Sequence, residues 1–178
     1  IYLYNHQNPL DVFVIQGYLR VPSITTAGLH LGLVFPWFSK SALNAGHVLM
    51  DHLNMSSRGS AVYKSSEILR RYGAIIIAPN GSLKTTILQR VSASAWVLAR
   101  KHDACIIPWT FAYENLKISE QDLYNPFKIL VRRIMARPST INCHLGRSKD
   151  LNLPSDPRDR EGFSQAVKLY YLEQQESG

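Results

Sequence analysis

A histidine and an aspartate five residues apart, His6 and Asp11, have the types and spacing needed for acid–base chemistry. Residues 1–4 are β-branched, aromatic and aliphatic, which predicts a short buried strand that delivers His6 to the rim of a sheet. Asn8-Pro9 then predicts a turn, and Asp11 opens an apolar stretch at the position where a carboxylate caps a helix. This turn could bring Asp11 back beside His6. A carboxylate at one imidazole nitrogen fixes the tautomer and increases the basicity of the other nitrogen, as a general base acting on an alcohol requires.

A second group of polar residues, Asn80, Gly81, Ser82 and Lys84, follows a predicted buried strand at residues 74–78. Gly81 would let the backbone approach a ligand closely, and Ser82 with Lys84 could bind an anion. An ordinary turn after a strand has the same composition. A nucleotide-binding P-loop is excluded, because Lys84 is not preceded by the required Gly.

The elements that must position these residues alternate between strand and helix patterns. Short apolar or β-branched runs predict strands at 1–4, 21–28, 47–51, 74–78, 105–109 and 140–146, and apolar residues at helical spacing predict helices at 11–19, 60–73, 91–104 and 163–175. Loops are predicted at 55–60 and 148–162. With 178 residues and 46% hydrophobic composition, the chain suits one domain, residues 1–178. We therefore expect a single α/β domain with a mainly parallel central sheet flanked by helices.

Residues 5–11, Asn-His-Gln-Asn-Pro-Leu-Asp, resemble the first motif of the glycerolphosphate and lysophospholipid acyltransferase family, in which Asn-His is followed by four residues and Asp. Taken alone, a His followed five residues later by an Asp also fits a plain capped turn. The resemblance implies an acyltransferase-like fold and transfer of a fatty acyl group from a thioester to a hydroxyl. It also implies that His6 is the base and that Asp11 is its orienting partner.

Three further segments follow the order of the family's motifs. His52 stands at the Arg of the second motif. The segment beginning at Pro79 is similar to the third motif, Phe-Pro-Glu-Gly-Thr-Arg-Ser, with Asn80 at the Glu and Leu83 at the Arg. Residues 106–109 are similar to the generic fourth motif, which lines the acyl or acceptor pocket in the family.

Both arginines of the family's pattern are therefore replaced, at His52 and Leu83. In the family the Arg of the second motif helps to hold the phosphate of the acceptor, so a glycerol-3-phosphate-type acceptor is in doubt. Arg58 and Lys84 could bind the same anion instead, although a solvated loop charge is an equally good interpretation of Arg58. We expect the following residues to contact substrate: His52, Arg58, Asn80, Gly81, Ser82 and Lys84.

The formal net charge of +7 favours an anionic partner: a phospholipid surface, an acidic acyl carrier, coenzyme A phosphates or nucleic acid. No nucleic-acid-binding motif is present, so we expect no nucleic-acid partner. Residues 125–138 interleave apolar side chains with Lys128, Arg132, Arg133 and Arg137. This composition suits an element lying on an anionic membrane, or a solvated edge of the fold. We expect peripheral association with the cytoplasmic face of a membrane.

Other features limit the possible cofactors and the cellular compartment. Cys105 and Cys143 are too few for a disulfide framework, which favours a reducing compartment. The six histidines are scattered, so no metal is implied. Residues 29–38 are strongly apolar, as either core packing or acyl-chain contact requires, but they are too short and too interrupted to span a bilayer. The chain begins without Met, so an upstream segment with a membrane anchor is conceivable.

These observations predict an O-acyltransferase that moves a fatty acyl group onto the hydroxyl of a lysophospholipid or glycerolipid. No cofactor is expected to stay bound, and acyl-CoA or acyl carrier protein is the expected co-substrate. The partners are then a lysolipid acceptor, an acyl thioester donor and an anionic membrane surface. The alternative is a catalytically weakened homologue that binds lipid or a partner protein, which the replacements at Asn80, Leu83 and His52 favour.

Overall fold

The structure is a computed structural model that describes residues 1–6, 11–19, 26–28, 48–50, 54–80, 91–113 and 141–176. In the described part of the chain, strands and helices alternate as expected at residues 2–19 and 55–113. The elements are β1 (Tyr2–Tyr4), α1 (Asp11–Leu19), β2 (Thr26–Gly28), β3 (Val48–Met50), α4 (Met55–Tyr72), β4 (Ile76–Ile77), α5 (Ser94–His102), β5 (Ile107–Tyr113), β6 (Ile141–Leu145), the 3-10 helix η2 (Ser148–Leu151) and α7 (Arg160–Glu176).

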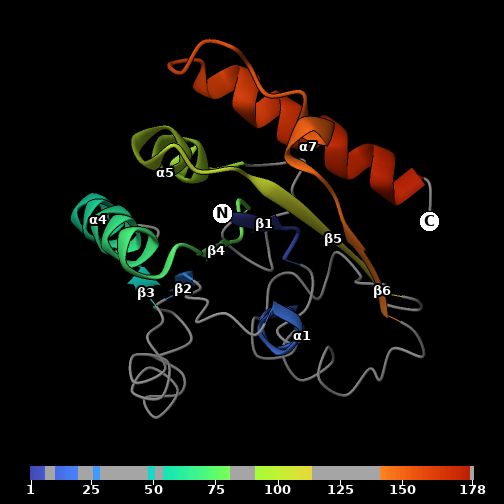
Figure 1. Cartoon of the computed structure of the whole chain (residues 1–178), viewed down its shortest axis with the longest axis horizontal. Coiled ribbons are helices and arrows are strands. Elements are labelled where there is room, and N and C mark those ends of the chain that lie inside the picture. Colours follow the sequence, from blue (N-terminus) through green and yellow to red (C-terminus); the bar gives the residue numbers. More distant parts are fainter. Residues whose placement is uncertain are drawn as a thin grey trace.

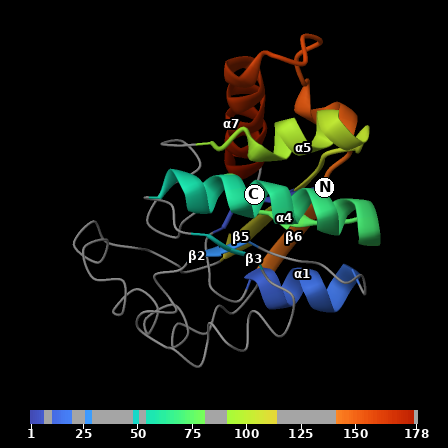
Figure 2. The ribbon, with the colours of Figure 1, turned by 90° about the vertical axis from the view of Figure 1, so that its left-hand side faces the viewer.

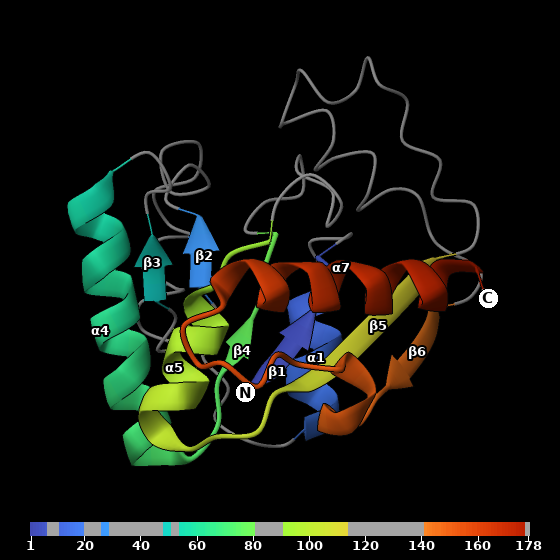
Figure 3. The same ribbon diagram turned by 90° about the horizontal axis from the view of Figure 1, so that it is seen from above.

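Four strands form the main sheet in the order β4-β1-β5-β6. Strand β1 lies between β4 and β5 and is parallel to both, whereas β6 is antiparallel to β5. Strands β2 and β3 form a separate parallel pair, which lies beside α4 in Figure 3. The expected α/β fold with a mostly parallel sheet is confirmed, and the antiparallel β6 makes the sheet mixed.

Helices cover both sides of this sheet. Figure 2 shows α5 and α7 on one side of the strands and α1 on the other. Because side chains alternate along a strand, Leu3 faces the cluster that includes α4, α5 and α7, whereas Tyr4 faces the cluster under α1. In β4, Ile77 belongs to the first of these clusters and Ile76 to the second. The prediction of a strand buried on both faces at 74–78 is therefore confirmed.

Helix α4 begins earlier than predicted. The Asn54 side chain accepts hydrogen bonds from the backbone amides of Ser56 and Ser57, at 2.9 and 3.2 Å, and so caps the helix at Met55. The prediction of a flexible loop at 55–60 is therefore wrong, and Arg58 lies in the first turns of α4. The predicted end is confirmed, because Gly73 adopts the left-handed conformation, with φ 74°, that suits glycine after a helix.

Two boundaries near the C-terminal half also differ from the prediction. The strand predicted at 105–109 is β5, which begins at Ile107 and continues past Trp109 to Tyr113. Pro108 lacks an amide proton, yet its carbonyl oxygen accepts a hydrogen bond from the Gly146 amide at 2.9 Å, so the proline keeps one link to the β6 side. The predicted loop at 148–162 contains η2, whose Leu151 is buried in the core.

Helix α7 crosses the sheet above β5 and β6 in Figure 1. The helix predicted at 163–175 is confirmed, and four residues at helical spacing on one face of it are buried, namely Phe163, Val167, Tyr170 and Tyr171. The Tyr171 hydroxyl donates a hydrogen bond of 2.6 Å to the Leu3 carbonyl oxygen, which ties the helix to the central strand. In the part of the chain that the structure describes, no helix has the length and apolar character to cross a bilayer.

Candidate active site

His6 and Asp11 lie together at the carboxyl end of β1, as the sequence predicts. His6 Nδ1 donates a hydrogen bond to Asp11 Oδ2 over 3.2 Å. The Asp11 side chain is fully buried, whereas the His6 side chain is 18% exposed. A buried carboxylate acts only as an acceptor, so it holds the proton on Nδ1 and leaves Nε2 as the nitrogen that can take a proton.

The local fold explains why the pair meets. Strand β1 ends at Tyr4, and Asp11 is the first residue of α1. The amino end of a helix carries a partial positive charge, so an acidic side chain in the first turn suits this position. The Tyr4 ring packs edge-on against the His6 ring, with their centroids 5.4 Å apart. The imidazole is thus held by a carboxylate and by an aromatic ring.

Asn5 is a residue of this site whose role the sequence did not reveal. Its side chain is buried and makes two hydrogen bonds with the backbone of Phe111 in β5. The Asn5 position is visible in the first motif, but its partner lies 106 residues away along the chain. No local pattern identifies such a partner.

The third-motif segment also reaches the site. Asn80 is buried, and its Nδ2 donates a hydrogen bond of 3.2 Å to the carbonyl oxygen of His6. The structure therefore brings Asn80 to His6, while its expected role in substrate binding stays a prediction. Gly81, Ser82 and Lys84 lie outside the described residues, as does His52. Arg58 forms no ion pair with any residue that the structure describes.

Two other described groups near the site, the Tyr4 hydroxyl and the Cys143 thiol, are not suited to act as nucleophiles. Burial raises the pKa of Tyr4, and the nearby Asp11 charge raises it further, so this hydroxyl stays neutral. Burial also raises the pKa of the Cys143 thiol, whose Sγ accepts a hydrogen bond of 2.7 Å from the Trp109 indole. His144, its neighbour in sequence, lies 3.4 Å from the Tyr170 hydroxyl of α7, so the two side chains point to opposite faces, as predicted for adjacent strand residues.

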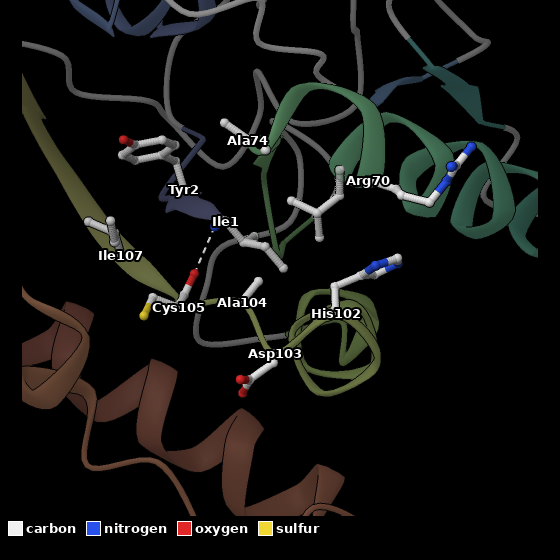
Figure 4. A pocket seen from close by; sticks show the side chains of 11 residues that line it. Ile1, Tyr2, Arg70, Ala74, His102, Asp103, Ala104, Cys105 and Ile107 are labelled. Atoms are coloured by element: carbon white, nitrogen blue, oxygen red, sulfur yellow. Dashed lines mark hydrogen bonds between the residues drawn. The ribbon is translucent and has the colours of Figure 1, made fainter.

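A surface pocket of about 540 Å³ lies at the opposite end of β1 from His6 (Figure 4). It is lined by residues from three regions, including Ile1, Arg70, His102 and Cys105. The Ile1 backbone nitrogen donates a hydrogen bond of 2.7 Å to the Cys105 carbonyl oxygen within it. Since neither His6 nor Asp11 lines this pocket, it does not belong to the candidate active site.

A mostly parallel α/β sheet with a histidine–carboxylate pair at the carboxyl end of its central strand is suited to general-base catalysis. A family model described as Acyltransferase matches residues 1–112, a span that includes β1, α1, β4 and most of β5. The chain belongs to this family, the glycerolipid acyltransferases, which is a family of enzymes. The family implies an acyl thioester donor and an acceptor. No curated protein and no solved structure gives a significant match to the chain.

Proposed function

We propose that this protein is an O-acyltransferase that moves a fatty acyl group from acyl-CoA or acyl carrier protein to the hydroxyl of a lysophospholipid or glycerolipid. The contact that carries the proposal is the 3.2 Å hydrogen bond between His6 Nδ1 and the buried Asp11 carboxylate. It leaves His6 Nε2 as a base at the end of a strand, on a partly exposed side chain.

The reaction requires one proton to be moved twice. His6 Nε2 takes the proton of the acceptor hydroxyl as its oxygen attacks the carbonyl carbon of the thioester. The tetrahedral intermediate then collapses, the carbon–sulfur bond breaks, and the protonated imidazole returns the proton to the leaving thiolate. Asp11 stabilises the imidazolium between the two steps by accepting the Nδ1 hydrogen bond. The products are an ester and a free thiol.

The acceptor is proposed to differ from the common phosphate-bearing lysolipids, or to be held by other cations. Neutral His52 and Leu83 replace the two arginines of the family's motifs. Neither side chain supplies the charged, two-pronged donor that phosphate prefers. Lys84 and Arg58 are the candidates to replace them.

We further propose that the protein works at the cytoplasmic face of an anionic membrane. The net charge of +7 supports this, as do exposed cations in the last turns of two helices, Arg70 and Arg71 of α4 and Arg100 and Lys101 of α5. Binding to anionic vesicles should exceed binding to neutral vesicles and should weaken with added salt. Equal sedimentation with both kinds of vesicle would remove the membrane proposal and leave the chemistry untouched.

A thiol-release assay tests the proposed reaction directly. Acyl-CoA donors of several chain lengths and an acylated acyl carrier protein are each combined with a panel of lysolipids, and thiol release is followed with a chromogenic disulfide. We expect release that depends on both donor and acceptor, together with an acylated lipid detected by mass spectrometry. If lipid binds but no donor and acceptor pair gives thiol above the enzyme-free rate, the chain is a weakened homologue and the proposal is wrong.

A further inference from the structure

Two buried asparagine side chains tie the backbone around His6 to the two strands beside β1. Asn5 is 2% exposed and Asn80 is 6% exposed. Their hydrogen bonds in this region are made with main-chain groups. A buried polar group without a hydrogen-bond partner costs about 1–3 kcal/mol of stability. The hydrogen bonds of Asn5 and Asn80 therefore help to offset the cost of burying these two amides in the site.

The Asn5 side chain continues the hydrogen-bonded ladder between β1 and β5. Its Nδ2 donates to the Phe111 carbonyl oxygen at 3.0 Å, and its Oδ1 accepts from the Phe111 amide at 2.7 Å. The last backbone pair of the two strands is Tyr4 with Trp109, so the amide of Asn5 takes the place that the next peptide group would occupy. The main chain is therefore free to leave the sheet at His6 while it stays anchored to β5.

Asn80 holds the same backbone from the β4 side. It lies just beyond the end of β4, and its Nδ2 donates to the His6 carbonyl oxygen at 3.2 Å. An amide can make this contact, because it carries two donor hydrogens. An ionised Glu, the residue in the family's third motif, has no hydrogen to give to a carbonyl oxygen. The contact thus depends on the residue in which this chain departs from the motif.

We propose that Asn5 and Asn80 are positioning residues that fix the His6 backbone from two strands, so that the imidazole remains on Asp11 and Nε2 remains aimed at the acceptor. The inference rests on the proposed function, in which His6 is the base. Neither asparagine needs to touch the substrate. A displacement of about 1 Å at a reacting group lowers a rate by up to about 100-fold, so small backbone shifts at His6 are expected to be costly.

The test compares Asn80→Ala, Asn80→Asp and Asn5→Asp with a matched control, Asn142→Ala, at an exposed position of β6. Asn80→Asp keeps the shape but removes the donor. Asn5→Asp keeps the acceptor for the Phe111 amide, so it retains one of the two hydrogen bonds and is less disruptive than Asn5→Ala, which would lose both. For each variant, kcat, KM and the thermal midpoint are measured, and the ¹⁵N spectrum of the His6 ring, assigned with His6→Gln, reports its tautomer.

We expect kcat to fall by about 10- to 100-fold in the three site variants, with KM changed by less than about 2-fold. The His6 ring should change from one tautomer, protonated at Nδ1, to a mixture of two. Asn142→Ala should resemble the wild type in every measurement. The ring spectrum does not depend on turnover, so it tests positioning even if His6→Ala proves as active as the wild type and the proposed function fails.

Two results would overturn the inference. If Asn80 variants raise KM while the His6 spectrum and kcat stay unchanged, Asn80 binds substrate and does not position His6. If only the thermal midpoint falls, and both kcat and the spectrum match the wild type below that midpoint, the two amides serve the stability of the fold alone.

Discussion

The two faces of the four-stranded sheet are built differently, and the difference separates stability from chemistry. Among the residues that the structure describes, the face under α4, α5 and α7 carries fifteen buried residues in one cluster, from Ile1 to Tyr171. The described residues of the face under α1 include six in a second cluster, of which Tyr4, Trp109 and Phe111 are aromatic. The smaller, aromatic face supports both members of the candidate pair, because Tyr4 packs on His6 and α1 begins at Asp11. We infer that, of these two described clusters, the one under α4, α5 and α7 serves mainly stability and the one under α1 positions the base.

The largest effect expected from this division is a loss of turnover after a substitution on the α1 face. Asp11→Asn should lower kcat by about 10²- to 10⁴-fold, because an amide can donate to Nδ1 as well as accept from it, so the imidazole loses its fixed tautomer. Stability should change little, since Asn is as good a residue as Asp at the start of a helix. Steady-state kinetics and urea unfolding of the same preparation check both parts. A large loss of stability with normal turnover would mean that Asp11 belongs to the structural face.

Gly146→Ala, on the α7 face, should lower stability and leave turnover unchanged, the opposite of Asp11→Asn. A Cβ at this buried position would overlap the Tyr170 hydroxyl and lie 2.9 Å from Pro108 Cγ. Overpacking of this kind costs about 1–3 kcal/mol of unfolding free energy, whereas kcat per folded molecule should be unchanged. Gly59→Ala is the matched control, because a Cβ added to this residue of α4 would have no neighbour within 4 Å among the described residues. The control should gain about 0.5–1 kcal/mol. Equal urea midpoints for Gly146→Ala and the wild type would contradict the close packing of α7.

Alkaline unfolding compares one buried tyrosine from each face. Burial raises the pKa of Tyr4, and burial followed by the Tyr170 charge raises the pKa of Tyr171 well above its ordinary value. Both hydroxyls stay protonated in the folded state, whereas an unfolded tyrosine loses its proton above about pH 10. The stabilising contribution is therefore complete below about pH 10 and is lost as the pH rises, by about 1.4 kcal/mol per pH unit for each tyrosine.

Tyr4→Phe and Tyr171→Phe should each flatten the fall in urea stability between about pH 9 and pH 11. Tyr171→Phe should also cost about 1 kcal/mol at neutral pH, because it removes the hydrogen bond to the Leu3 carbonyl oxygen. An unchanged alkaline slope in both variants would show that these hydroxyls ionise in the folded state.

Sequence patterns predicted the α7 face better than the α1 face, for a physical reason. Helical spacing of apolar residues identified Ala95, Leu98, Phe163 and Val167, because a helix buries one stripe of its own sequence. Phe111 packs under α1 from the part of β5 beyond Trp109, where the sequence indicated the end of the strand.

The candidate site was predictable only in part. The spacing of His6 and Asp11 is local, so the motif and the turn between them indicated their contact. The partners of Asn5 and Asn80 are set by strand order, which is not local, since β1 pairs with β4 and β5, two strands that come much later in the chain. Helix α4 was predicted too short because the cap at Asn54 precedes a Ser- and Gly-containing stretch with weak helix preference.

The most direct test of the central claim is the rate of His6→Ala with a saturating acyl thioester and a lysolipid that the wild type uses. His144→Ala is the matched control, because that histidine lies on the other side of the sheet, beside Tyr170. We expect kcat of His6→Ala to fall by about 10²- to 10⁴-fold with a normal urea midpoint, and that of His144→Ala to stay near the wild-type value. Turnover by folded His6→Ala at close to the wild-type rate would contradict the assignment of His6 as the base.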